Sequence, residues 1–104
     1  MSNNNGVTFE MSSIDTALLI SGQPYQRPVR EGRLRELTRD WDPGLLDPLV
    51  VGYRDGSFYL VDGQHRVIIQ RRMYGGDFNA PCKLYHGLTY KAEAELCWKL
   101  DKAR

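Results

Sequence analysis

The chain has 104 residues, of which 41% are hydrophobic and 26% charged, and its formal net charge is +1. These values lie near the averages of globular proteins, so they exclude a disordered or fibrous chain, and the length suits one hydrophobic core. The apolar runs are far shorter than the roughly 20 residues that span a bilayer, and no basic segment followed by an apolar one opens the sequence. We expect a disordered tail over residues 1–8, then a single cytoplasmic domain over residues 9–104 with no membrane partner.

Two cysteines, Cys82 and Cys97, are present. They lack the CxxC or Cys/His spacing of a zinc site or a redox pair. We therefore expect two buried thiols that form no disulfide, which suits a reducing compartment.

The first structural signals come from residues 22–28 and 31–41. The earlier segment contains two prolines, which forbid a regular helix and hold the chain extended. The later one is predicted to be an amphipathic helix, because an Asp-Pro-Gly sequence ends a helical spacing of the apolar residues Leu34, Leu37 and Trp41.

Residues 48–53 and 57–62 are rich in β-branched and aromatic side chains and flank the pair Asp55-Gly56. An Asp-Gly pair tolerates the positive φ angles of a tight reversal, so these segments predict a β-hairpin. The stretch from Gly63 to Gly75-Gly76 is ambiguous, because its β-branched residues 67–69 also suit a strand. We choose a helix, since about ten residues separate the glycine signals and strands are usually shorter.

Residues 81–85 are predicted to form a further strand, and Thr89 is a plausible N-cap for a helix over residues 90–102. The order of elements is then β-α-β-β-α-β-α. This order predicts an α+β fold, with about three helices on a small sheet.

The turn over residues 62–66 is the best candidate for chemistry. A strand end, a glycine and a helix start would bring backbone N–H groups and the positive helix end to one point, which suits an anion. Gly63 allows close approach of a phosphate, Arg66 could bind its oxygens, and His65 could donate a hydrogen bond or a proton. Asp62 could hold a ribose hydroxyl, a metal ion or Arg66 itself. By spacing alone, a helix cap with an Asp-Arg salt bridge is the favoured alternative.

Nine of the ten arginines lie in the first three quarters of the chain. Arginine is well suited to phosphate or carboxylate, so this bias suggests an anionic partner. Acidic residues are interspersed among those of residues 30–39, and for that group a solvated, salt-bridged face is the favoured interpretation.

Three short segments together resemble the ParB/sulfiredoxin-like superfamily: VDGQHR at 61–66, PLVV at 48–51 and YQRP at 25–28. The resemblance covers roughly residues 14–100 and implies a small mixed sheet. In the N-terminal domain of ParB partition proteins, a Gly-X-X-Arg segment opens a helix and binds nucleotide phosphates, and an upstream Gln/Arg stretch closes over the site. The DGQHR wording resembles phage, mobile-element and DNA-modification-linked proteins, and the related DGQQR occurs in GmrSD-type restriction enzymes.

This resemblance implies roles for individual residues. The nucleotide-binding candidates are Gly63, Gln64, His65, Arg66 and Arg27. The catalytic candidates are Gln26, His65 and Asp62. Because Gln64 stands where sulfiredoxin has its reactive cysteine, sulfiredoxin chemistry is not expected.

The leading functional hypothesis is a module that binds a nucleoside triphosphate, CTP or ATP with or without Mg²⁺, with slow NTPase activity as a further step. The resemblance places it in plasmid or phage DNA maintenance or defence, with DNA and a homodimer partner as further expectations. One alternative is a ParB-like metal-dependent nuclease, in which Asp62 and a second acid hold the metal. The other is a non-enzymatic DNA- or protein-interaction domain in which Arg66 is purely structural.

Overall fold

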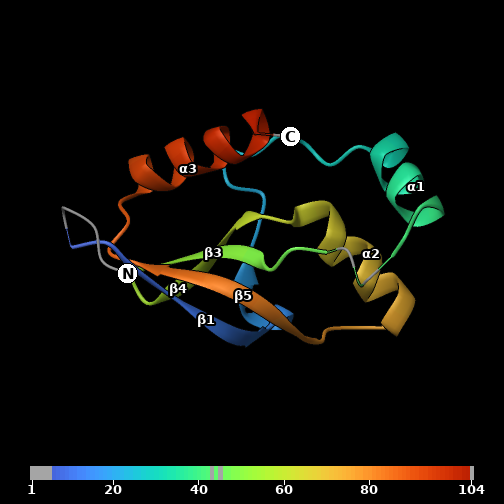
Figure 1. Ribbon diagram of the computed structural model, residues 1–104, viewed down its shortest axis with the longest axis horizontal. Helices are drawn as coiled ribbons and strands as arrows, with labels where there is room; N and C mark the ends of the chain where they lie inside the picture. The colour runs from blue at the N-terminus through green and yellow to red at the C-terminus, as the bar shows by residue number, and fades with distance from the viewer. Residues whose placement is uncertain (1–5, 43, 45, 104) are drawn as a thin grey trace.

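Five strands form one mixed sheet in the computed structural model, which describes residues 6–42, 44 and 46–103 (Figure 1). The elements follow in the order β1 (Thr8–Asp15), a 3-10 turn (Thr16–Leu18), β2 (Leu19–Ile20), α1 (Glu31–Arg39), β3 (Leu49–Arg54), β4 (Ser57–Asp62), α2 (Gln64–Tyr74), β5 (Asn79–His86) and α3 (Tyr90–Lys102). Of the three α-helices, α2 and α3 pack on the sheet, while α1 lies beside α2 (Figure 1). In the described part of the chain, no helix is long and apolar enough to cross a membrane.

The predicted order of helices and strands is confirmed, with differences in detail. The 3-10 turn and the two-residue β2 were not predicted, since so short a strand leaves no pattern in the sequence. Helix α1 ends at Arg39 rather than at Trp41, because the N–H of Trp41 turns back to the Thr38 carbonyl. Strand β1 already begins at Thr8, and residues 1–5 of the predicted tail lie outside the described residues.

The sheet has the order β1-β5-β3-β4-β2, with β3 at its centre. Strand β3 pairs parallel to β5 and antiparallel to β4. Because successive side chains of a strand point to opposite faces, Val50 and Val51 enter different halves of the core. The half around Val51 contains Ile14, Leu49, Leu60, Val67, Ala80, Cys82 and Leu84. The half around Val50 contains Val61 and Cys97, with Tyr25, Tyr85, Leu96 and Leu100 packed against them.

The predicted hairpin joins β3 to β4. Asp55 and Gly56 have φ angles of 52° and 79°. Both angles are positive, as a tight two-residue reversal between twisted strands requires.

Strand β2 decides where the chain runs next. It pairs parallel to β4, with Leu19 opposite Phe58 and Ile20 opposite Tyr59. Parallel strands end at the same edge of a sheet, so the chain leaving β2 and the chain leaving β4 emerge side by side. Residues 21–30, here called the connector, therefore lie beside the turn from β4 into α2. In Figure 1 the connector then passes the C-terminal end of α3 before it enters α1.

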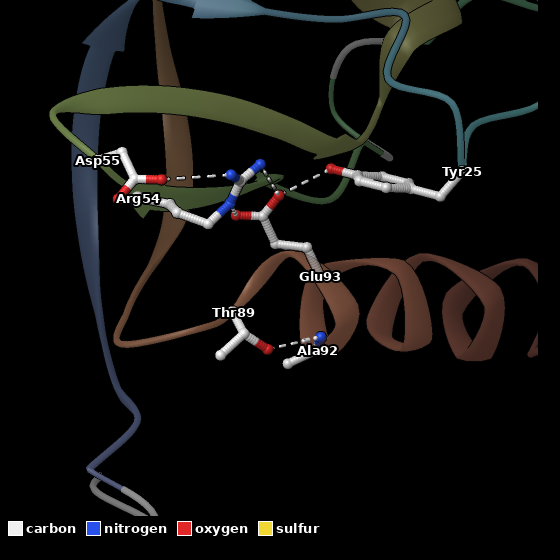
Figure 2. A network of polar contacts seen from close by, with 6 residues as sticks. All are labelled: Tyr25, Arg54, Asp55, Thr89, Ala92 and Glu93. Carbon is white, nitrogen blue, oxygen red and sulfur yellow. Dashed lines mark hydrogen bonds and ion pairs between the residues drawn. The ribbon is translucent and has the colours of Figure 1, made fainter.

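A buried polar network ties α3 to the sheet and to the connector (Figure 2). The Glu93 side chain is 0% exposed, and its carboxylate accepts hydrogen bonds from Arg54 Nε at 2.9 Å and Arg54 Nη2 at 3.3 Å. The Tyr25 hydroxyl donates to the same carboxylate at 3.1 Å. The Arg54 guanidinium also lies 4.1 Å from the Tyr59 ring centroid. Burial, and then the charge of Glu93, raise the pKa of Tyr25, so this hydroxyl remains a donor.

Candidate functional site

A cavity of about 500 Å³ opens where the connector, the β4–α2 turn, α1 and the C-terminal half of α3 meet. Its lining includes all of the site residues predicted from the sequence, namely Gln26, Arg27, Asp62, Gly63, Gln64, His65 and Arg66. The two segments that the sequence analysis singled out separately therefore share one site. The parallel pairing of β2 with β4 is what brings them together.

Gly63 makes the turn into α2 possible. It has a φ angle of 108°, in the left-handed region, and its carbonyl accepts the first helical hydrogen bond, from Val67 N at 3.0 Å. Among the described residues, no side chain makes a capping hydrogen bond at this helix end. The N–H groups of the first turn have no acceptor within the helix, and the residues that carry them line the cavity.

The Arg66 guanidinium contacts two groups, one in the turn and one in the segment before β3. Its Nη2 lies 3.9 Å from Asp62 Oδ2, and the two side chains are only 14% and 13% exposed. Its Nη1 also donates a hydrogen bond to the Asp47 carbonyl. The Asp-Arg pair that spacing alone favoured is thus formed, and both members also line the cavity.

Two glutamine amides hold the connector in place. Gln64 accepts a hydrogen bond from Gly22 N at 3.1 Å and donates one to the Arg27 carbonyl at 3.3 Å. The Gln26 amide donates to the Leu60 carbonyl at 2.7 Å, which fastens the connector to β4. The polar groups of both glutamines are therefore engaged with the protein's own backbone.

His65 lies between the helix start and the connector. Its Nε2 accepts a hydrogen bond from Arg30 N at 3.4 Å. Burial, and then the guanidinium groups of Arg33 and Arg30, lower the pKa of His65. The imidazole is therefore neutral near pH 7, with a lone pair on Nε2.

Comparison with known proteins adds a family and a fold. The model of a family described as a family of unknown function, DUF6551, matches residues 21–101. The chain belongs to this family. Every residue that lines the cavity falls within the matched range. No curated protein sequence matches the chain.

Three solved structures show the fold. The C-terminally truncated chromosome-partitioning protein ParB from Caulobacter crescentus, complexed with CTP-gamma-S, is 20% identical with a TM-score of 0.72, covering 91% of this chain and 54% of that one. A pNOB8-like ParB N-domain is 20% identical with a TM-score of 0.65, covering 100% and 38% of the two chains. Sulfiredoxin from Arabidopsis thaliana is 21% identical with a TM-score of 0.53, covering 72% and 83%. The chain thus has a ParB/sulfiredoxin-like fold and spans about half the length of that Caulobacter ParB structure.

The sequence analysis missed several cavity residues. Arg30 and Arg33 were assigned to a solvated face, yet both line the cavity, Arg30 as the N-cap residue of α1 and Arg33 within this helix, while Arg35 of α1 does not. Their spacing of three residues, which places both on one side of a helix, was the available signal. Asp101 of α3 was also missed, and its carboxylate lies 3.6 Å from Arg27 Nε.

The two cysteines differ in their surroundings. Neither forms a disulfide, as predicted. Cys82 is buried among the sheet side chains, and burial raises the pKa of its thiol to about 11. Cys97 is buried on the other face of the sheet and lines the cavity. The sequence analysis predicted a buried Cys97 thiol but did not place it at the site, because a lone cysteine in a helix forms no motif.

The nuclease alternative needs acids that can share a metal ion. Over the described ranges, no group of three or more His, Cys, Asp or Glu side chains could hold one. Asp62, the acid named for that role, lies beside Arg66.

Proposed function

We propose that this chain binds a nucleoside triphosphate in the cavity at the start of α2. The observation that carries the proposal is the convergence of an uncapped helix N-terminus and four arginines on that cavity. Its volume of about 500 Å³ lies within the range of roughly 300 to 1,000 Å³ that small-molecule sites occupy. The fold shared with a ParB that was solved with CTP-gamma-S supports the same proposal.

The charges around the cavity suit a polyanion. Four arginines and three aspartates line it. Arg66 is close to Asp62 and Arg27 to Asp101, so these two pairs are largely balanced. Arg30 and Arg33 are exposed at the start of α1, next to a neutral His65, and Arg33 pairs with the exposed Glu36 at 3.3 Å. Phosphates between the N-terminus of α2 and these two arginines would receive both backbone and guanidinium hydrogen bonds.

Replacing Arg30 by alanine is expected to weaken triphosphate binding about tenfold, because a charge-assisted hydrogen bond is worth roughly 1.5 kcal/mol or more. The measurement is calorimetric titration with ATP, CTP, GTP and UTP, with and without Mg²⁺. Arg35→Ala is the matched control: it removes the same charge from the adjoining helix α1, away from the cavity, and should change affinity less than about twofold. Arg66→Ala is a poorer probe, since it also removes the partner of Asp62.

Circular dichroism serves as the folding control for both variants. Absence of binding by the wild-type chain at millimolar nucleotide would contradict the proposal. Equal affinities of Arg30→Ala and wild type would remove Arg30 from the site.

A bound triphosphate is expected to protect Cys97 from alkylation, because this residue, 6% exposed, lines the cavity that the ligand would fill. At a nucleotide concentration ten times Kd, the modification rate should fall about elevenfold by mass action. Cys82 is an internal control, since it is 0% exposed and its thiol pKa is raised to about 11 by burial. Peptide mass mapping after iodoacetamide treatment measures both rates. A Cys97 rate that nucleotide leaves unchanged would mean that the ligand lies elsewhere.

We also propose that the chain hydrolyses the bound triphosphate slowly. Gln26, His65 and Asp62 line the cavity, and the Nε2 lone pair of the neutral His65, which accepts from Arg30 N at 3.4 Å, activates a water molecule only once that water replaces Arg30 N. Phosphate release in the presence of Mg²⁺, compared between wild type and His65→Ala, tests this step. From the fold alone, we propose a role in DNA maintenance or defence, with DNA and a second copy of the chain as partners. Gel-shift experiments test DNA binding and sedimentation tests dimer formation, each with and without nucleotide.

A further inference from the structure

The Gln64 side chain connects two distant points of the connector. Its Oε1 accepts from Gly22 N and its Nε2 donates to the Arg27 carbonyl, so one amide fastens both ends of a six-residue stretch. Gln64 is the first residue of α2 and is half-buried at the cavity wall. An amide can accept and donate at the same time, which a carboxylate, an ammonium or an apolar side chain cannot do.

The connector has few other attachments at its N-terminal end. It follows β2, which is only two residues long, and Gly22 has a φ angle of 74° with open space around it. Further along, the Tyr25 hydroxyl and the Gln26 amide bind Glu93 and the Leu60 carbonyl. Gln64 thus supplies the attachment at Gly22 and a second one at Arg27.

We infer that Gln64 is a positioning residue that holds the connector against the start of α2 and so presents Arg27 and Arg30 to the cavity. This inference rests on the proposed function and adds to it, because it assigns Gln64 to the connector rather than to the ligand. A connector that is already ordered does not have to be ordered when the ligand binds. Without the Gln64 amide, the conformational entropy lost on ordering the connector is added to the free energy of binding, and the affinity falls.

The test replaces Gln64 by methionine, which has a similar length and helix propensity but cannot make these hydrogen bonds. Gln70→Met is the matched control, since it makes the same change on the same helix, where the Gln70 amide donates a hydrogen bond to the Tyr74 hydroxyl at 3.5 Å and makes none to the connector among the described residues. Hydrogen exchange of the Gly22 N–H is followed by NMR in the protein without ligand. Affinities for MgATP and MgCTP are measured by titration, and thermal unfolding is recorded for all three proteins.

In Gln64→Met, we expect the Gly22 N–H to exchange at least about threefold faster and the nucleotide affinity to fall about five- to tenfold. Gln70→Met should match wild type in both measurements, and the melting temperatures should agree closely. Unchanged Gly22 exchange in Gln64→Met would overturn the inference, as would faster exchange with unchanged affinity. If the wild type binds none of the four nucleoside triphosphates, with or without Mg²⁺, the proposed function fails, and the Gly22 exchange rate still decides whether Gln64 holds the connector.

Discussion

Replacing Glu93 by alanine is expected to lower the free energy of unfolding by about 3 kcal/mol, because it leaves the Arg54 charge inside the protein without its main partner. Glu93 is 0% exposed and Arg54 is 16% exposed, with 2.9 Å between Arg54 Nε and Glu93 Oε2 (Figure 2). The Tyr25 hydroxyl would lose its acceptor as well. Urea denaturation followed by circular dichroism measures the change.

Two further variants serve as comparisons. One separates the loss of the Glu93 charge from the loss of side-chain volume, and the other compares this buried pair with an exposed one. Glu93→Gln keeps the volume and one acceptor, so its cost should be smaller, about 1 to 2 kcal/mol. Glu36→Ala breaks the exposed Glu36–Arg33 pair, whose side chains are 58% and 46% exposed, and should cost less than about 1 kcal/mol. A Glu93→Ala protein as stable as Glu36→Ala would show that the buried network does not hold α3 to the sheet.

Replacing Gly63 by alanine is expected to cost about 3 kcal/mol, for two separate reasons. The φ angle of 108° lies where a Cβ is strained, at about 1 to 2 kcal/mol. A Cβ at this position would also lie 2.4 Å from Leu49 Cδ2 in the core, and relieving such overpacking costs about 1 to 3 kcal/mol. Urea denaturation again provides the measurement.

Gly75→Ala is the control that isolates the steric contribution. Gly75 ends the same helix with a φ angle of 80°, and a Cβ there meets nothing within 4 Å. Its alanine variant should therefore show only the conformational cost, about 1 kcal/mol. Equal losses at the two glycines would contradict the proposed contact with Leu49. Replacing Gly63 thus lowers the stability of the fold, and this effect would mask any effect on the approach of a phosphate. Replacing Arg30 is therefore the better test of binding.

The elements that depend on local backbone chemistry could be predicted from the sequence alone. Asp55-Gly56 predicts the hairpin because only certain residues tolerate positive φ angles, and Gly63 and Gly75 delimit α2 for the same reason. Thr89 begins α3 through its own side chain, which accepts a hydrogen bond from Ala92 N at 3.1 Å. The turn at residues 62–66 was singled out by its glycine at a strand end and helix start, whereas Gln26 and Arg27 were assigned to the site through the resemblance of YQRP to the superfamily.

How these segments act together depends on contacts between residues that lie far apart in the chain. Gln64 reaches Gly22 across 42 residues, and Tyr25 reaches Glu93 across 68. Arg30 and Arg33 belong to the cavity because β2, too short to leave a pattern, pairs parallel to β4 and directs the connector there. Periodicity and capping act over a few residues, whereas the partner of a side chain and its burial depend on which distant strands pair. Strand pairing across the whole sheet therefore determines which charged side chains line the cavity.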